Sequence, residues 1–191
     1  MQLYRFGRFV CRVFFNTFFR LEVSGTENVP EQGAVILASN HISTLDPPLV
    51  GTPLKRVVRF MAKEELFKVP VLGTIIRNVG AFPVKRGGVS KESIRHALQL
   101  LKEGGVMGIF PEGTRGGGMG KKGAASLALR SGAVVIPVGI IGNYKMFSKI
   151  KIVYGKPVDL SAYRESTSSD SLEQATEHIM SSIRELLTAR K

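Results

Sequence analysis

Short apolar runs that alternate with helical segments constrain the fold of this 191-residue chain more than any other feature of its sequence. Residues 34–39 read Ala-Val-Ile-Leu-Ala-Ser, which suits a short buried strand. Similar strands are expected at residues 21–24, 57–62, 81–85, 106–110, 134–138 and 150–154. Helices are expected at residues 48–53, 71–79, 90–103 and 123–131, and a last amphipathic helix begins near Asp170. This alternation predicts a single α/β layered domain, with a mixed, mostly parallel sheet flanked by helices.

The charge of the chain is strongly positive and unevenly distributed. Lys and Arg number 27 against 15 Asp and Glu, which gives a net charge of +12. Residues 54–101 carry ten basic and three acidic groups, and residues 102–156 carry nine and two, so these segments hold the whole excess. Nucleic acid, an anionic membrane surface and a phosphorylated small molecule are the partners that such a charge attracts. Nucleic acid is the least favoured, because the basic middle of the chain holds few aromatic residues.

The first 20 residues differ in character from the rest. Arg5, Arg8 and Arg12 recur at helical spacing along one face, and apolar residues occupy another. The aromatic residues that we expect at a membrane interface are Phe6, Phe9, Phe14 and Phe18. The pattern predicts an amphipathic helix at residues 1–20 that lies on a membrane surface, followed by the domain proper at residues 21–191. The alternative is a helix packed on the core of its own domain.

Several classes of protein and site are excluded by what the sequence lacks. The uncharged run at residues 13–19 is too short to span a bilayer, and arginines interrupt any signal-peptide core. The single cysteine, Cys11, excludes a disulfide framework, and the three histidines have no metal-ligand spacing, so no metal site is expected. A Gly-x-Ser-x-Gly elbow and a complete P-loop are also missing.

His41 is a candidate catalytic residue, because it follows the strand at residues 34–39 at the edge where α/β sheets carry their sites. Asp46 lies five residues further on. On a continuous helix the two side chains would point about 140° apart, so they meet only if the segment turns. Asp46 would then hold one imidazole nitrogen while the other acts as a base. The alternative for His41 is a purely structural histidine. The alternative for Asp46 is a helix N-cap, with Pro47 at the first helical position.

Cations beside glycines mark candidate anion sites. Within residues 80–87, a predicted strand ends at Lys85 and Arg86, next to glycine. The planar guanidinium of Arg86 suits a phosphate. Lys121 and Lys122 open a helix, where backbone N–H groups favour an anion. We therefore expect the excess charge to surround the phosphate-binding segments of the chain. The alternative for each segment is a solvated turn.

Residues 110–115 read Phe-Pro-Glu-Gly-Thr-Arg, in which Glu112 suits a hydroxyl and Arg115 a phosphate, although a plain β-turn is the alternative. Four blocks thus occur in order: Asn40-His41 with Asp46, residues 80–87, residues 110–115 and residues 135–138. Together they resemble the four blocks of the glycerolipid acyltransferases, above all those that acylate 1-acylglycerol 3-phosphate. The blocks span residues 40–138, about half of the chain.

The resemblance implies that the protein moves an acyl group from a thioester to the sn-2 hydroxyl of lysophosphatidate, which gives phosphatidate. It implies that His41 is the general base, that Asp46 orients it and that no covalent acyl-enzyme forms. The residues implied to bind the phosphate and glycerol of the acceptor are Arg86, Glu112, Gly113, Thr114 and Arg115. We add Lys85, Lys121 and Lys122 as candidate contacts for the donor or another anion.

The resemblance also implies which partners the chain meets. No bound cofactor is expected, and acyl-CoA or acyl carrier protein would serve as co-substrate. The expected partners are lysophosphatidate and a membrane surface with anionic lipids, without nucleic acid, and the expected location is peripheral, on the cytoplasmic face. The alternatives are an acyltransferase for glycerol 3-phosphate or another lysolipid, and a non-catalytic basic module that binds lipid or nucleic acid.

Overall fold

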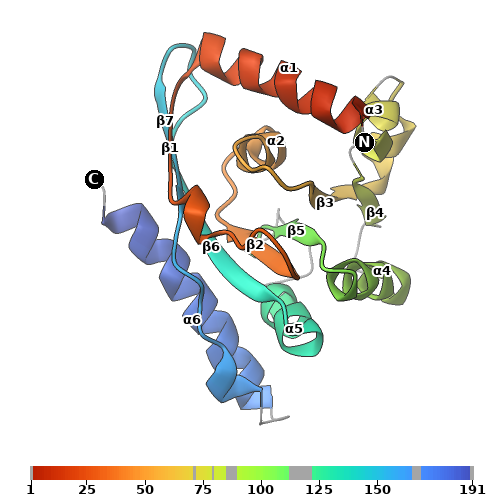
Figure 1. The fold of residues 1–191 in the computed structure, drawn as a ribbon, viewed down its shortest axis with the longest axis vertical. Helices are drawn as coiled ribbons and strands as arrows, with labels where there is room; N and C mark the ends of the chain where they lie inside the picture. Colours follow the sequence, from red (N-terminus) through yellow and green to blue (C-terminus); the bar gives the residue numbers. More distant parts are fainter. Residues whose placement is uncertain are drawn as a thin grey trace.

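The structure is a computed structural model, and it describes residues 2–70, 72–78, 80–84, 90–111, 122–164 and 169–189. Within these residues, seven strands form one sheet in the order β1-β7-β6-β2-β5-β3-β4 (Figure 1). Their bounds are β1 Arg20–Ser24, β2 Val35–Ser39, β3 Val58–Lys63, β4 Phe82–Val84, β5 Val106–Ile109, β6 Val134–Gly142 and β7 Lys149–Tyr154. The predicted strands are all present, with ends that differ by a few residues.

One antiparallel pair, β6 with β7, interrupts a sheet whose other pairs are parallel. A short turn joins β6 to β7, which is the connection that an antiparallel pair permits, whereas parallel neighbours need longer crossovers. The carboxyl ends of β2, β5, β3, β4 and β6 therefore share one edge of the sheet. The prediction of a mixed, mostly parallel sheet flanked by helices is confirmed.

Helices cover the sheet on both faces, so its strands are apolar on both sides. In β2, Val35 and Leu37 pack toward α1 and α2, while Ile36 and Ala38 pack toward α4, α5 and α6. Figure 1 shows these two helical layers above and below the sheet. The helices are α1 Gln2–Phe18, α2 Asp46–Gly51, α3 Leu72–Asn78, α4 Lys91–Lys102, α5 Lys122–Ser131 and α6 Ser169–Thr188. Short 3₁₀ helices lie at Thr26–Asn28, Glu64–Lys68 and Ser161–Tyr163.

Helix α4 illustrates how local sequence sets the ends of an element. Ser90 caps its N-terminus, because its hydroxyl accepts a hydrogen bond from the backbone N–H of Ser93 at 3.1 Å. Past its C-terminus, Gly104 adopts a φ of 74°, a left-handed conformation that glycine reaches without a steric penalty. Ala97 and Leu101 of its apolar stripe are buried. The helix expected at residues 90–103 is therefore confirmed.

Helix α1 lies against the domain through one side and leaves the other side exposed. Phe15 is buried, and burial of such a side chain stabilises a fold by roughly 1.5–3 kcal/mol. Arg8 donates from Nη1 to the carbonyls of Leu54 and Lys55, at 2.7 and 3.0 Å. The hydroxyl of Tyr4 accepts a hydrogen bond from a backbone N–H at the start of β3. Arg8 therefore contacts the protein itself, unlike the exposed Arg5 and Arg12.

The outer side of α1 carries large apolar side chains. Phe6 and Phe9 are 64% and 63% exposed. The other members of this exposed set are Leu3, Val10, Val13, Phe14 and Phe18. No helix among the described residues is long and apolar enough to cross a membrane. The helix thus packs on its own core through one side while a second, apolar side remains uncovered.

Candidate active site

The candidate active site lies at the shared carboxyl edge of the parallel strands. His41 follows β2 and Phe110 follows β5, and these two strands are hydrogen-bonded neighbours. Asn40 fixes the end of β2 against β6, because its side-chain amide donates to the carbonyl of Ile140 at 2.9 Å and accepts from its N–H at 2.7 Å. Asn40 is buried, and this pair of hydrogen bonds positions the backbone directly before His41.

The chain turns between His41 and Asp46, and the two side chains meet. The His41 Nδ1 and Asp46 Oδ2 atoms are 2.6 Å apart. The same carboxylate oxygen accepts from the backbone N–H groups of Ile42 and Ser43, at 2.6 and 2.7 Å. Asp46 is the first residue of α2, and Leu45 precedes it without a side-chain cap. The N-cap alternative for Asp46 is therefore wrong, because its carboxylate turns back toward the preceding loop.

Asp46 is fully buried, yet its surroundings favour the ionised form. Burial alone would raise the pKa of its carboxyl group, but the hydrogen bonds from His41, Tyr144 and the two backbone N–H groups hold that pKa below its ordinary value. The Tyr144 hydroxyl donates to Asp46 Oδ1 at 2.6 Å. Burial, followed by the bond to the carboxylate, raises the pKa of Tyr144, so the phenol keeps its proton.

An ionised Asp46 only accepts hydrogen bonds, so the proton in its bond to His41 belongs to Nδ1. In the neutral imidazole, the other ring nitrogen, Nε2, then carries the free lone pair. No described residue forms a hydrogen bond with Nε2, and the side chain is 17% exposed. A ring nitrogen that is basic, reachable and aimed by a buried carboxylate is the arrangement that general-base catalysis requires.

Aromatic rings fix the plane of the imidazole. The rings of His41 and Phe110 stack with centroids 4.2 Å apart, and Phe60 of β3 stacks on Phe110 at 5.8 Å. Gly108 of β5 makes room for Phe60, because a Cβ atom at this position would lie 2.0 Å from the Phe60 ring. The stack therefore connects three residues from three neighbouring segments of the site.

Most of the residues expected to contact the substrates lie outside the described residues. These are Lys85, Arg86, Glu112, Gly113, Thr114, Arg115 and Lys121. Lys122 is described as the first residue of α5, and its Nζ lies 3.4 Å from Oε2 of Glu173 in α6. Among the described residues no group of acidic, histidine or cysteine side chains is placed to hold a metal ion.

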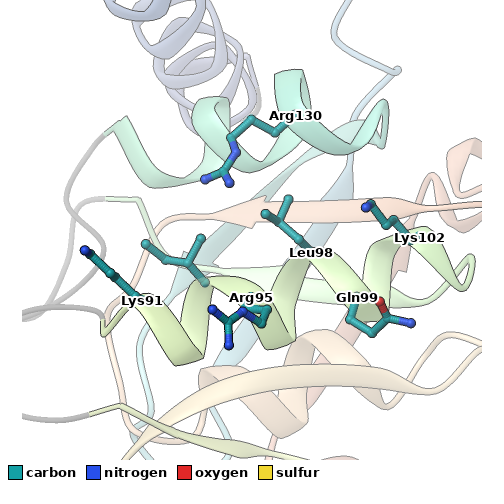
Figure 2. Close-up of a pocket in the computed structure, with 7 residues that line it drawn as sticks. Lys91, Arg95, Leu98, Gln99, Lys102 and Arg130 are labelled. Atoms are coloured by element: carbon teal, nitrogen blue, oxygen red, sulfur yellow. The ribbon is translucent and has the colours of Figure 1, made fainter.

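Part of the positive charge gathers around a cavity that neither His41 nor Asp46 lines. A cavity of about 370 Å³ lies between α4 and α5, and Figure 2 shows the cations around it. Lys91, Arg95 and Lys102 come from α4 and Arg130 comes from α5, with Ile94 and Leu98 among them. These cations belong to the segments that hold the whole excess charge. The segments expected to bind phosphate lie mostly outside the described residues, so the expectation that the excess charge surrounds them stays a prediction.

Comparison with known proteins identifies the family. The sequence model of the family described as Acyltransferase matches residues 20–141, which is more than half of the chain and includes both His41 and Asp46. The chain belongs to the acyltransferase family. This acyltransferase is 30% identical over 192 residues to the 1-acyl-sn-glycerol-3-phosphate acyltransferase of Bacillus subtilis, and the match covers 96% of each chain. It is also 30% identical over 136 residues to the protein of that name from Borreliella burgdorferi, covering 68% of this chain and 54% of the relative.

A solved structure has the same fold as this acyltransferase. It is the crystal structure of the 1-acyl-sn-glycerophosphate acyltransferase PlsC from Thermotoga maritima. The two structures superimpose with a TM-score of 0.69 and 27% sequence identity, over 99% of this chain and 80% of the other. The expected family and fold class are therefore both confirmed.

Three residues of the site in this acyltransferase were missed by sequence reasoning. Tyr144 reaches Asp46 across 98 residues of sequence, and no local pattern marks it. Phe110 belongs to the block at residues 110–115 but had no role assigned, and Phe60 was expected only as part of a strand. A signal for Phe110 existed in principle, because residues directly after β2 and β5 must meet at the sheet edge.

Proposed function

We propose that this acyltransferase moves a fatty acyl group from a thioester to the sn-2 hydroxyl of lysophosphatidate and so makes phosphatidate. The observation that carries the proposal is the His41–Asp46 pair, in which the carboxylate is buried and no described residue bonds to Nε2 of the imidazole. Relatives named as 1-acyl-sn-glycerol-3-phosphate acyltransferases support the choice of acceptor. Acylation of glycerol 3-phosphate or of another lysolipid is the neighbouring alternative.

In the proposed mechanism, Nε2 of His41 removes the proton of the acceptor hydroxyl as its oxygen attacks the thioester carbon. The carbon–sulfur bond then breaks, and the imidazolium returns the proton to the thiolate that leaves. The Asp46 carboxylate stabilises the imidazolium that exists between these two steps. The acyl group passes directly to the acceptor, so the reaction needs no acyl-enzyme and no bound cofactor. Acyl-CoA or acyl carrier protein would supply the thioester.

For the acceptor, we propose that Arg86 and Arg115 bind the phosphate and that Glu112, Gly113 and Thr114 hold the glycerol. The support is the resemblance of residues 80–87 and 110–115 to the family blocks, together with the bidentate geometry of guanidinium and phosphate. Lys85, Lys121 and Lys122 remain candidate contacts for the donor. Arg86→Ala and Arg115→Ala should raise the acceptor KM, and an unchanged KM for both would remove them from the site.

We further propose that the protein is peripheral to the membrane, on the cytoplasmic face, and that α1 lies on the anionic lipid surface. The exposed apolar side of α1 supports this, because it points away from the core that Phe15 enters. Exposed Arg5 and Arg12 suit lipid phosphates. Removal of residues 1–20 would also uncover the core, so point changes such as Phe6→Ser and Phe9→Ser test the surface better.

The decisive experiment compares His41→Ala with His96→Ala in purified protein. His96 is an exposed histidine of α4 and serves as the matched control. With a labelled acyl thioester and a panel of lysolipids, we expect His41→Ala to lose about 10²- to 10⁴-fold in kcat with lysophosphatidate, and His96→Ala to match the wild type. Retained turnover in folded His41→Ala would refute the base assignment. The acceptor panel separately decides between lysophosphatidate and the neighbouring alternatives.

A further inference from the structure

Two large apolar side chains outside α1 stand exposed in the turn between β6 and β7. Met146 and Phe147 are each 63% exposed, as exposed as the outermost phenylalanines of α1. The turn follows β6, which ends at Gly142, and leads into β7 at Lys149. Sequence reasoning gave this pair no role. Two adjacent side chains of this size in water are unfavourable unless something covers them.

The turn is fastened to the C-terminal end of α1. The backbone N–H of Phe147 donates to the carbonyl of Phe18 at 2.7 Å, and the N–H of Arg20 donates to the carbonyl of Ser148 at 2.9 Å. Figure 1 shows the turn beside this end of the helix. Phe14 and Phe18 are the exposed aromatic residues of the last turn of α1. Met146 and Phe147 therefore lie next to the end of α1 that carries Phe14 and Phe18.

The shape of the turn is fixed by its own hydrogen bonds. Asn143 accepts from the N–H of Lys145 through its side chain at 3.0 Å, and its carbonyl accepts from the Ser148 hydroxyl at 2.6 Å. Phe147 has a φ of 62°, a left-handed conformation that is uncommon outside glycine. Non-glycine residues keep such a conformation only where the surroundings impose it, often at binding sites. Here the left-handed backbone at Phe147 carries an exposed aromatic ring that gains no stabilisation from burial in the core.

We propose that the Met146–Phe147 turn enters the same lipid surface as α1, as a second contact of the domain with the membrane. This inference rests on the membrane association proposed above. A lipid surface is the occupant that fits, because apolar side chains here stand beside cationic ones. Lys145 precedes the pair and is exposed, and no described residue pairs with its ammonium group, so it is free to reach lipid phosphates.

The same turn also touches the catalytic pair. Tyr144, two residues before Met146, donates to Asp46 and packs edge-on against Phe19, with ring centroids 5.7 Å apart. The lipid contact and the support of Asp46 are thus parts of one turn of about six residues. A lipid contact at this turn would therefore be joined through Tyr144 to the carboxylate that holds His41.

Tryptophan fluorescence tests the proposal directly, because the chain contains no tryptophan. The variant Phe147→Trp puts the sole emitter at the tip, and His96→Trp puts it on α4 in the opposite helical layer as the matched control. The probes are vesicles of phosphatidylcholine with phosphatidylglycerol, with and without brominated acyl chains. We expect a blue shift and bromine quenching for Phe147→Trp and neither for His96→Trp.

A second variant measures the strength of the contact by co-sedimentation with the same vesicles. Met146→Ser with Phe147→Asn removes both apolar groups, and asparagine tolerates the left-handed backbone. We expect at least about tenfold weaker binding, equivalent to about 1.4 kcal/mol. We also expect a larger loss of turnover on lysophosphatidate in vesicles than on a short-chain, monomeric lysophosphatidate.

The outcomes separate this proposal from the ones on which it rests. Equal vesicle binding by the double variant and the wild type, or a Phe147→Trp spectrum that vesicles leave unchanged, would overturn the role of the turn while α1 kept its own. A spectral shift that depends on protein concentration without vesicles would assign the turn to a second copy of the chain and overturn the lipid contact. Failure of the wild type to bind vesicles would refute membrane association as a whole, and normal turnover in that case would leave the chemistry standing.

Discussion

Replacement of Asp46 by asparagine removes the negative charge of this side chain and nearly keeps its shape. Asparagine is nearly isosteric, and its amide oxygen can still accept from the backbone N–H groups of Ile42 and Ser43. What disappears is the negative charge beside the imidazolium of the proposed mechanism. With about 4 Å between charge centres and an effective dielectric constant of about 20, the lost stabilisation is about 4 kcal/mol. This predicts a fall in kcat of about 10³-fold.

The assay is steady-state turnover with lysophosphatidate and a labelled thioester, with kcat and the acceptor KM measured separately. The KM should change little, because the Asp46 side chain is buried and bonded only to protein groups. Tyr144→Phe is the matched comparison, since it removes a hydrogen bond to the same carboxylate and keeps the charge, and we expect a loss of about tenfold or less. A kcat loss below tenfold in folded Asp46→Asn, or a loss confined to KM, would refute the assigned role.

Three other predictions concern the pair and its surroundings. Because the pKa of Asp46 lies below its ordinary value of about 3.9, its charge stabilises the folded state above that pH. The difference in unfolding free energy between the wild type and Asp46→Asn, measured in urea, should thus be constant near neutral pH and shrink as the pH falls below about 4. A difference that grows in acid would contradict a lowered pKa for Asp46. Gly108→Ala should push Phe60 out of the stack, cost about 1–3 kcal/mol of stability and lower kcat, and an unchanged kcat would show that the stack does not hold the imidazole. Tyr154→Phe removes the buried hydrogen bond to the carbonyl of Val50 and should cost about 1–3 kcal/mol in urea with kcat preserved, so a selective loss of activity would contradict its structural role.

Local patterns in the sequence predicted the elements of the fold well. The strand at residues 34–39 and the capped helix at residues 90–103 are set by their own residues, as β2 and α4 show. Strand order was not predicted, because β1 pairs with β7 through contacts more than a hundred residues apart in sequence. The periodicity of residues 1–20 predicted the helix, but it did not predict which side chains of the helix pack on the core. Phe15 and Phe19 are the buried phenylalanines of this segment, and their burial depends on residues of distant elements in the same core cluster.

The catalytic pair was only half determined by sequence. The spacing of His41 and Asp46 allowed a turn or a cap, and only the resemblance to the acyltransferase blocks favoured the turn. Tyr144 lay beyond any local argument, because it reaches Asp46 from the turn after β6, 98 residues further along the chain. The local sequence also did not predict the exposed Phe147, which has a left-handed backbone conformation that phenylalanine disfavours.

The bond between His41 and Asp46 closes a loop of only five residues, whereas that between Tyr144 and Asp46 joins groups 98 residues apart. Short loops cost little entropy to close and do so within about 10–100 ns, while distant contacts wait for the chain to collapse. The base and its carboxylate are therefore expected to find each other early in folding, before the sheet is complete. We expect Tyr144 to join them last, when β6 and β7 are in place, so that the proposed catalytic pair is fully assembled only once the chain has folded.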